Sequence, residues 1–369
     1  MYKYLCLIML LLSGAAFAND CIVVFGRNDE IINVQAKNIS MREEEIVITL
    51  RKDYYEVDVT FDFFNSGAAE KVQLGFPVEG RGSPGIKSQV DSVYDFKSYL
   101  NGKIIPVHTT RKETIADENT NNTGIYIKWF IRDVTFPANS RTVSRVTYKA
   151  MYSYCGGLNL AGYIYGTGRF WKGGIGKMTL IVNHGDDELI GKIRFGNPMD
   201  LNEKYDIKAK SSKFTWEANG RYKYVFENVN PRYTNESISI DVWALKSGLY
   251  GADVNPFIIC DRTKRGDHIN NYHVEYFWPW SEHLLYEKPT EIQLYTKNQI
   301  RLFINFFSAL HGYDFKNPLY KEYFSKLESF EDKDNTKYEV NPNFNESVFN
   351  EIERKNVNYL LKLEKMIPK

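Results

Sequence analysis

Three histidine residues stand close together in the sequence, and carboxylate residues flank them. The group consists of His268, His273 and His283, together with Asp267, Glu275 and Glu282. Histidine and carboxylate side chains are the usual ligands of catalytic zinc, so this composition would suit a hydrolase. Zinc hydrolases place such ligands at fixed helical spacings such as H-E-x-x-H, and the cluster has no such spacing. We therefore predict no metal site here, and a hydrolase site would have to assemble from residues distant in sequence.

A glycine-rich segment, residues 166–176, has part of the composition of a phosphate-binding loop. The dinucleotide fingerprint requires a third glycine where Trp171 stands, and a P-loop requires Ser or Thr after its lysine, where Met178 follows Lys177. The sequence also lacks a Gly-x-Ser-x-Gly nucleophile elbow. We predict no catalytic residue and no cofactor, and the sequence favours a non-enzymatic protein.

The best binding candidates are a histidine and three aromatic residues in the C-terminal third. His311 stands directly before a glycine, where a histidine can cap the end of a helix, and contact with a ligand is the alternative role. Trp278 and Trp280 belong to the aromatic run 276–280, whose rings either fill a seam between two parts of the protein or form an exposed platform. We predict His311, Tyr313, Trp278 and Trp280 as binding residues.

Three cysteines follow the N-terminal segment: Cys21, Cys155 and Cys260. An oxidising compartment would permit one disulfide among them, and the spacing leaves both Cys21–Cys155 and Cys155–Cys260 open. Unpaired buried thiols are the alternative. The absence of a C-x2-C pair disfavours a structural zinc site.

The chain begins with the features of a secretory signal peptide. Lys3 supplies a positive charge, an apolar run covers residues 5–12, and small residues lead up to Ala18. This order predicts cleavage before Asn19. The apolar run is shorter than the roughly 20 residues that a membrane span needs, and we predict no transmembrane segment after cleavage. We expect an exported protein, with the periplasm and the outside of the cell both open as its location.

The charge of the remaining chain is balanced. Lys3 is the only charged residue of the predicted signal peptide, so 46 basic and 46 acidic residues remain of the 47 and 46 in the full sequence. A neutral chain with mixed charges has neither the basic footprint of a nucleic-acid-binding protein nor a polybasic segment for anionic lipid. We expect no nucleic-acid partner.

Alternation of apolar and polar residues with period two marks most of the chain and predicts antiparallel strands with one buried face. The clearest pair of strands covers residues 45–63, and the turn at 65–67 follows it. Further alternating segments are residues 72–76, 125–131, 143–152, 178–182, 222–226 and 237–243. Pro77 is expected to end the strand before it, and the polar segment 117–123 is expected to be an exposed hairpin tip.

The period changes from two to that of a helix after Pro289. Five residues at helical spacing share one face: Ile300, Phe303, Ile304, Phe307 and His311. Thr296 is the expected N-cap of this helix and Gly312 its stop signal. A second helix should open at Asn317–Pro318 and a third after Asn345. The third helix would turn four apolar residues inward: Phe349, Ile352, Leu360 and Leu363.

These patterns predict a mainly β protein, built from antiparallel β-sandwich domains, with a small C-terminal α-helical domain. The predicted boundaries are a signal peptide at 1–18, a β-sandwich domain at 19–154, a second β domain at 155–287 and the helical domain at 288–369.

The C-terminal stretch from Ile300 to Leu363 resembles the YARHG domain, an extracytoplasmic module of bacterial envelope proteins named for a Tyr-Ala-Arg-His-Gly motif. The residues that carry the resemblance are Ser308-Ala309-Leu310-His311-Gly312, Tyr313-Asp314-Phe315, Leu319, Tyr323-Phe324, Tyr338, Asn341-Pro342 and Phe349 to Asn356. Ser308 and Leu310 depart from the motif, so no role of the family's arginine carries over. The region from Asn19 to Trp280 resembles an uncharacterised exported bacterial domain family in residues 72–77 and 165–171.

The resemblance implies an exported, envelope-associated binding protein whose helical module is the interaction unit, with cell-wall material or an envelope protein as its partner. Two alternatives are an envelope hydrolase with a site assembled from distant residues, and a structural or adhesive surface protein.

Overall fold

The protein is built mainly of β-strands, and the α-helices that the structure describes lie in its C-terminal part. The computed structural model describes residues 16–17, 19–25, 31–82, 93–114, 124–155, 158–184, 189–196, 213–234, 236–244, 291–294, 296–325, 340–349 and 351–368. The predicted hairpin tip at 117–123 lies outside these ranges. No helix within the described ranges is long and apolar enough to cross a membrane.

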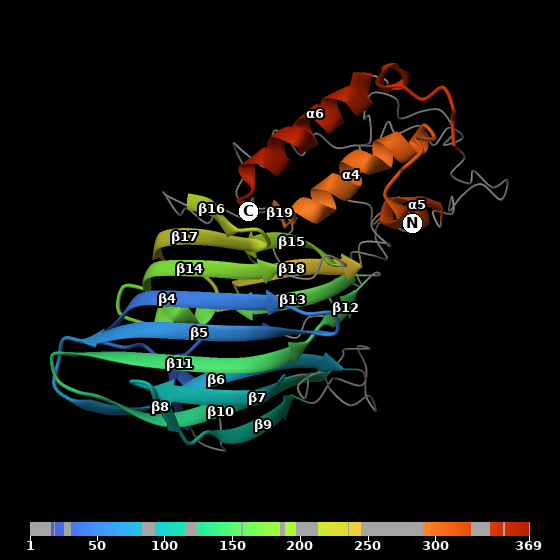
Figure 1. The fold of residues 1–369 in the computed structure, drawn as a ribbon. Coiled ribbons are helices and arrows are strands. Elements are labelled where there is room, and N and C mark those ends of the chain that lie inside the picture. The colour runs from blue at the N-terminus through green and yellow to red at the C-terminus, as the bar shows by residue number, and fades with distance from the viewer. Residues whose placement is uncertain are drawn as a thin grey trace, which may run out of the picture.

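Within the described residues, nineteen strands and one short 3-10 helix make up the β body, most of which is labelled in Figure 1. The strands are β1 (Ala16–Phe17), β2 (Cys21–Phe25), β3 (Ile31–Val34), β4 (Ile39–Leu50), β5 (Tyr54–Asn65), β6 (Glu70–Gly82), β7 (Val93–Leu100), β8 (Lys103–Ile105), β9 (His108–Thr114), β10 (Gly124–Phe136), β11 (Ser140–Met151), β12 (Ser153–Cys155), β13 (Leu158–Ile164), β14 (Ile175–His184), β15 (Leu189–Gly196), β16 (Lys213–Ala218), β17 (Arg221–Val229), β18 (Ser237–Ala244) and β19 (Glu291–Leu294). The 3-10 helix η3 (Gly166–Phe170) lies between β13 and β14.

The predicted strand pair at 45–63 forms the centre of an eight-stranded sheet, ordered β16-β17-β14-β4-β5-β11-β7-β8. β4 and β5 pair antiparallel, as the alternation predicted. Alternate residues of β5 are buried: Tyr55, Val57, Val59, Phe61 and Phe63. The predicted turn follows, where the side-chain oxygen of Asn65 accepts a hydrogen bond of 2.9 Å from the N–H of Gly67.

Strand β14 joins this sheet between β4 and β17, parallel to β4 and antiparallel to β17. The parallel pair differs from the antiparallel pairing expected from sequence, and it is possible because many residues separate the two strands. One buried core contains Ile46 and Phe61 together with Leu180 and Phe226. The predicted division between two β domains at residue 155 therefore crosses a shared sheet and a shared core.

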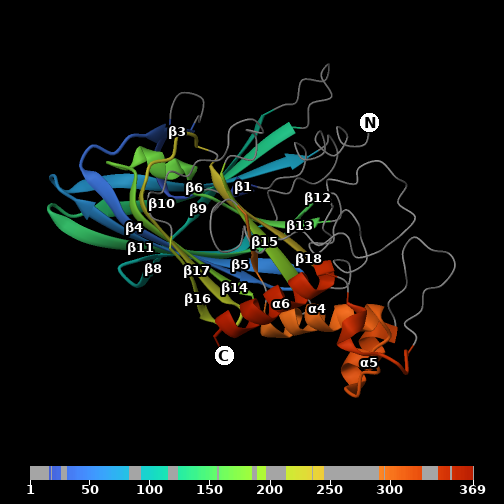
Figure 2. The same cartoon turned by 90° about the horizontal axis from the view of Figure 1, so that it is seen from above.

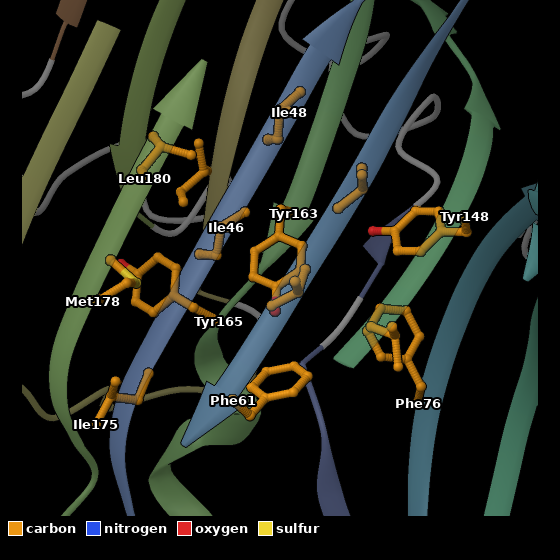
Figure 3. Packing of buried hydrophobic residues seen from close by; sticks show 14 of the residues in the cluster. Ile46, Ile48, Phe61, Phe76, Tyr148, Tyr163, Tyr165, Ile175, Met178 and Leu180 are labelled. Atoms are coloured by element: carbon orange, nitrogen blue, oxygen red, sulfur yellow. The ribbon is translucent and has the colours of Figure 1, made fainter. Parts of the chain in front are cut away.

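A second sheet, ordered β3-β2-β6-β10-β9, faces the first, and β1 also pairs with β6. Rings from the two sheets meet between them. Phe96 of β7 stacks on Phe130 of β10 with 4.1 Å between ring centroids. The ring centroids of Phe76 in β6 and Tyr148 in β11 are 5.5 Å apart (Figure 3). Two sheets whose inner side chains interlock form a β-sandwich, which confirms the predicted fold class.

Strand β6 continues through Pro77, so the prediction that this proline ends the strand is wrong. Pro77 lies opposite Trp129 of β10, and that pairing runs along the whole of β6. On its other side β6 pairs with β2 up to Gly75 and with β1 from Val78. Pro77 falls between these two pairings, where the missing N–H does not interrupt a ladder.

A third sheet, ordered β12-β13-β18-β15-β19, completes the β body. Tyr163 of β13 and the following Tyr165 are buried in the shared core (Figure 3). The glycine-rich segment that comes next is closely packed, since a Cβ on Gly166 would lie 2.4 Å from the carbonyl oxygen of Tyr233. The glycine at this position is therefore explained by close backbone approach.

The helical module contains α4 (Lys297–Leu310), α5 (Pro318–Ser325), the 3-10 helix η6 (Glu346–Val348) and α6 (Glu351–Met366). Thr296 caps α4 as predicted. Its hydroxyl accepts a hydrogen bond from the N–H of Gln299 at 3.3 Å, and its own N–H donates to the Gln299 side chain at 3.0 Å. This reciprocal capping box satisfies amide donors that a helix start leaves without partners.

The second and third helices also begin near their predicted positions. Asn317 precedes Pro318 at the start of α5, and its side-chain oxygen accepts a hydrogen bond of 3.0 Å from Leu319. Asn345 caps η6, and the long helix α6 begins only at Glu351.

Helices α4 and α6 lie side by side, joined by an ion pair in which Arg301 Nε lies 2.9 Å from Glu364 Oε1. Figures 1 and 2 show that α4 begins beside the sheets and that its other end, with α5, projects away from them. The module thus has one end attached to the β body and one end directed outward.

Candidate functional site

His311 is the C-cap residue of α4, at the outward end of the helical module (Figure 1). The N–H of Gly312 donates to the carbonyl of Ala309 at 3.0 Å, and Gly312 has a φ of +77°, which suits glycine after a helix. The His311 ring packs against Phe349, with 5.5 Å between ring centroids. This contact connects the end of α4 to the segment that leads into α6.

Tyr313 lies in an aromatic cluster beside His311. Its ring meets those of Phe315 and Phe344 edge-on, at centroid distances of 4.9 and 5.0 Å, and 38% of the tyrosine remains exposed. The N–H of Asn341 donates to the carbonyl of Gly312 at 2.8 Å. The segment before α6 therefore supports the loop after α4 from one side.

Three apolar residues of this region are exposed: Tyr313 of the aromatic cluster, Leu319 of α5 and Val340 beside Asn341, which we together call the terminal patch. Leu319 lies in the first turn of α5 and is 69% exposed, and Val340 directly precedes Asn341. Exposed apolar residues that gather at one place mark candidate interaction surfaces. The terminal patch is the candidate interaction surface of this module.

The opposite end of the module is attached to the β body by polar contacts. Gln299 Nε2 lies 3.3 Å from His184 Nε2 at the end of β14, and the N–H of Lys297 donates to Asn219 Oδ1 at 3.0 Å. Gly220, with a φ of +72°, lets the turn before β17 come close to the end of β14, because a Cβ there would lie 2.1 Å from the carbonyl oxygen of His184. The attachment fixes the start of α4 and leaves the terminal patch at the far end.

Two predicted binding residues, Trp278 and Trp280, lie outside the described residues, as do His268, His273 and His283. Their roles stay predictions. In the described part of the chain, no three His, Cys, Asp or Glu side chains gather closely enough to hold a metal ion.

Cys21 is a buried free thiol. Its Sγ lies 3.3 Å from Asn33 Oδ1 and 3.6 Å from the carbonyl oxygen of Gly75. Burial raises the pKa of this thiol, and the neighbouring carboxylate of Asp20 raises it further, so the thiol stays protonated and unreactive. The Cys155 side chain and the whole of Cys260 lie outside the described residues, and disulfide pairing stays a prediction.

A second polar group lies inside the β body. Asp20 and Arg132 form an ion pair in which neither side chain has exposed surface. Glu44 of β4 is also buried, and it accepts hydrogen bonds from Asn19 Nδ2 at 3.0 Å and from the Tyr163 hydroxyl at 2.6 Å. We call Asn19, Asp20, Glu44, Arg132 and Tyr163 the buried polar cluster.

Burial dominates the ionisation of this cluster. It raises the pKa of Glu44 to about 8, although the hydrogen bond from Tyr163 lowers it and the charge of Asp20 raises it. Burial also raises the pKa of Asp20, against the attraction of Arg132. Burial therefore favours the protonated form of Glu44 in this structure.

The buried polar cluster was missed from sequence, although a signal for it exists. Glu44 stands in phase with Ile46 and Ile48 on the buried face of β4. Arg132 stands in phase with Phe130 and Val134 of β10. A charged residue on the apolar face of an alternating strand is expensive to bury unless it has a partner, so such positions indicate a buried polar contact.

The fold and the candidate site define a mainly β protein with a C-terminal helical module that carries an exposed, partly aromatic end. Residues 274–365 match the YARHG domain, which confirms the resemblance seen in the motif around His311. The YARHG domain is an extracytoplasmic domain, and the matched range includes the predicted binding residues Trp278 and Trp280. No curated protein matches the chain.

Two solved structures show distant likeness. One is a "putative nutrient binding protein" from Legionella pneumophila subsp. pneumophila str. Philadelphia 1, which is 17% identical with a TM-score of 0.47. The match covers 95% of this chain and 98% of the Legionella chain. The other is an M1 zinc metallopeptidase from Deinococcus radiodurans, which is 9% identical with a TM-score of 0.28. The match covers 57% of this chain and 43% of the metallopeptidase chain. At these scores neither structure bears on the function of this chain.

Proposed function

We propose that this chain is an exported, non-enzymatic binding protein of the bacterial cell envelope and that its helical module is the interaction unit. The observation that carries the proposal is the terminal patch, because it exposes apolar residues of α5 and of the segments before and after it, within the range that matches the YARHG domain. The β body would act as the rigid support. The predicted signal peptide and the extracytoplasmic character of the YARHG domain support export.

Cell-wall material is the partner that we propose first. The processed chain would be electrically neutral, so attraction to nucleic acid or to anionic lipid offers little affinity. An exposed tyrosine beside apolar residues can instead cover the face of a sugar ring or of a peptide stem at low entropic cost. An envelope protein is the alternative partner.

Sedimentation of the full-length processed protein with purified cell-wall sacculi tests this proposal. Leu319→Ser in the terminal patch should lower the bound fraction by about fivefold, since a buried apolar anchor dominates many interfaces. Ile104→Ser is the matched control, because Ile104 of the β body is 67% exposed, close to the 69% of Leu319. Circular dichroism would verify that both variants fold.

Equal retention of the two variants would argue against a role for the terminal patch. If the unaltered protein itself stays in the supernatant, the cell wall is excluded as the partner. A photo-crosslinking residue placed at position 319 in intact cells then tests the envelope-protein alternative.

A further inference from the structure

Asn19 and Asp20 are held inside the β body by residues that follow them in the chain. The hydroxyl of Thr167 donates to the carbonyl of Asn19 at 2.8 Å, and the indole N–H of Trp171 donates to the carbonyl of Asp20 at 2.9 Å. The Asp20 carboxylate pairs with Arg132. None of these contacts involves the predicted signal peptide, so all of them can persist after its removal.

The buried polar cluster contains one carboxyl group more than it contains permanent cations. It contains the carboxyl groups of Asp20 and Glu44 but only one permanent positive charge, that of Arg132, which pairs with Asp20. Glu44 has no cationic partner among the described residues. The Oδ1 atoms of Asn19 and Asp20 are buried and accept no hydrogen bond within the part of the chain that the structure describes. The Nε and Nη1 atoms of Arg132 are likewise buried and donate no hydrogen bond there, so the surplus concerns the carboxyl charge of Glu44, which a second cation beside it would balance.

Cleavage at the predicted position creates such a cation. Hydrolysis of the Ala18–Asn19 peptide bond consumes one water molecule, whose oxygen joins the Ala18 carbonyl to give the carboxylate of the released peptide. Both protons of that water end on the Asn19 nitrogen, which becomes an ammonium group with three donors. Because the side-chain Nδ2 of Asn19 lies 3.0 Å from Glu44 Oε2 and Asn19 is fully buried in the uncut chain, the ammonium forms on a residue that already contacts Glu44.

We propose that the α-ammonium group formed at Asn19 is the ion-pair partner of Glu44, so that removal of the signal peptide completes the buried polar cluster. The inference rests on the proposed export. With the ammonium in place the cluster holds two carboxylates and two cations and is neutral. In the uncut chain, burial instead raises the pKa of Glu44, the response expected of a carboxyl group without a cation.

Labelling of the terminal amine tests the inference directly. The intact mass of the exported protein should show Asn19 as its first residue. An amine-reactive acylating ester should then label this α-amine at least about tenfold more slowly in the native protein than in urea, since a buried group reacts only after opening. A different first residue overturns the inference, and equal labelling rates overturn the burial of the ammonium while leaving export intact.

The variant Glu44→Gln gives a second, independent readout. In the mature protein it leaves the ammonium without a counter-ion, and the unfolding equilibrium constant should rise at least about tenfold. In a matched chain that keeps Ala16 to Ala18 before Asn19, glutamine replaces a carboxyl group that has no cation, and stability should stay equal or rise. An equal loss of stability in both chains would indicate a packing role alone and would overturn the inference. If the variant does not fold, the labelling of the unaltered protein still decides.

Discussion

Arg132 and Asp20 lie on inner faces of the β body, where neither side chain has exposed surface. Removing two charges from water costs several kcal/mol for each ion, and only close pairing and hydrogen bonds offset this cost. Such a pair gives little net stability in comparison with apolar residues. Its partners nevertheless depend on each other strongly, because either charge alone would be buried without compensation.

Arg132→Met should therefore destabilise the protein by about 3–5 kcal/mol, since it leaves the Asp20 carboxylate unpaired. The double variant Asp20→Asn with Arg132→Met should recover part of this loss. Urea unfolding measures both. Arg145→Met is the control, because its pair with Asp58 is well exposed and should contribute about 1 kcal/mol or less. Similar losses for the buried and exposed pairs would contradict this account.

The raised pKa of Glu44 predicts that the stability of the uncut chain depends on pH. Its pKa is about 8 in the folded state against an ordinary value of 4.5, so between these values the folded chain binds more protons than the unfolded chain. Stability should therefore fall as pH rises through this window, by an amount on the order of 2–4 kcal/mol. Urea unfolding at pH values from 5 to 8 should show this slope in the uncut chain but not in its Glu44→Gln variant. Parallel curves for the two chains would show that Glu44 does not cause it.

The capping box of α4 controls where the helical module begins. Thr296 and Gln299 satisfy each other's backbone N–H groups, and Gln299 also contacts His184 of β14. The same few residues therefore start the helix and attach it to the β body. The sequence predicted Thr296 as the N-cap, but the contact across to β14 joins residues 115 positions apart and left no local pattern.

Thr296→Ala should lower stability by about 1 kcal/mol, because it removes the hydroxyl that accepts a hydrogen bond from the N–H of Gln299. Thr296→Ser retains that hydroxyl and should stay within a few tenths of a kcal/mol of the unaltered protein. Thermal unfolding followed at 222 nm, where helices dominate the signal, compares the two. A serine variant as unstable as the alanine variant would assign the effect to the lost methyl group instead.

The shared core predicts that the β body unfolds as one unit in the part of the chain that the structure describes. Strand β14 lies between β4 and β17, so it connects strands from both sides of the predicted domain boundary at residue 155. Leu180 is fully buried at this junction (Figure 3). Removal of its side chain should therefore destabilise strands on both sides of residue 155.

Leu180→Ala should destabilise the protein by about 3 kcal/mol through the lost apolar contact and the cavity that remains. Hydrogen exchange measured by mass spectrometry should show faster exchange in β5 and in β17 together, with Ile104→Ala as an exposed control. Faster exchange in β17 alone would indicate that the two predicted β domains unfold independently.

Local patterns in the chain were enough to predict the strands at 45–63, the turn after them, the Thr296 cap and the motif around His311, because each depends on residues that are close in sequence. Folding in three dimensions set the parallel position of β14, the passage of β6 through Pro77 and the buried polar cluster. Arg132 reaches Asp20 across 112 positions, and Tyr163 reaches Glu44 across 119. Alternation predicts which face of a strand is buried, but it contains no information about which distant strand will cover that face.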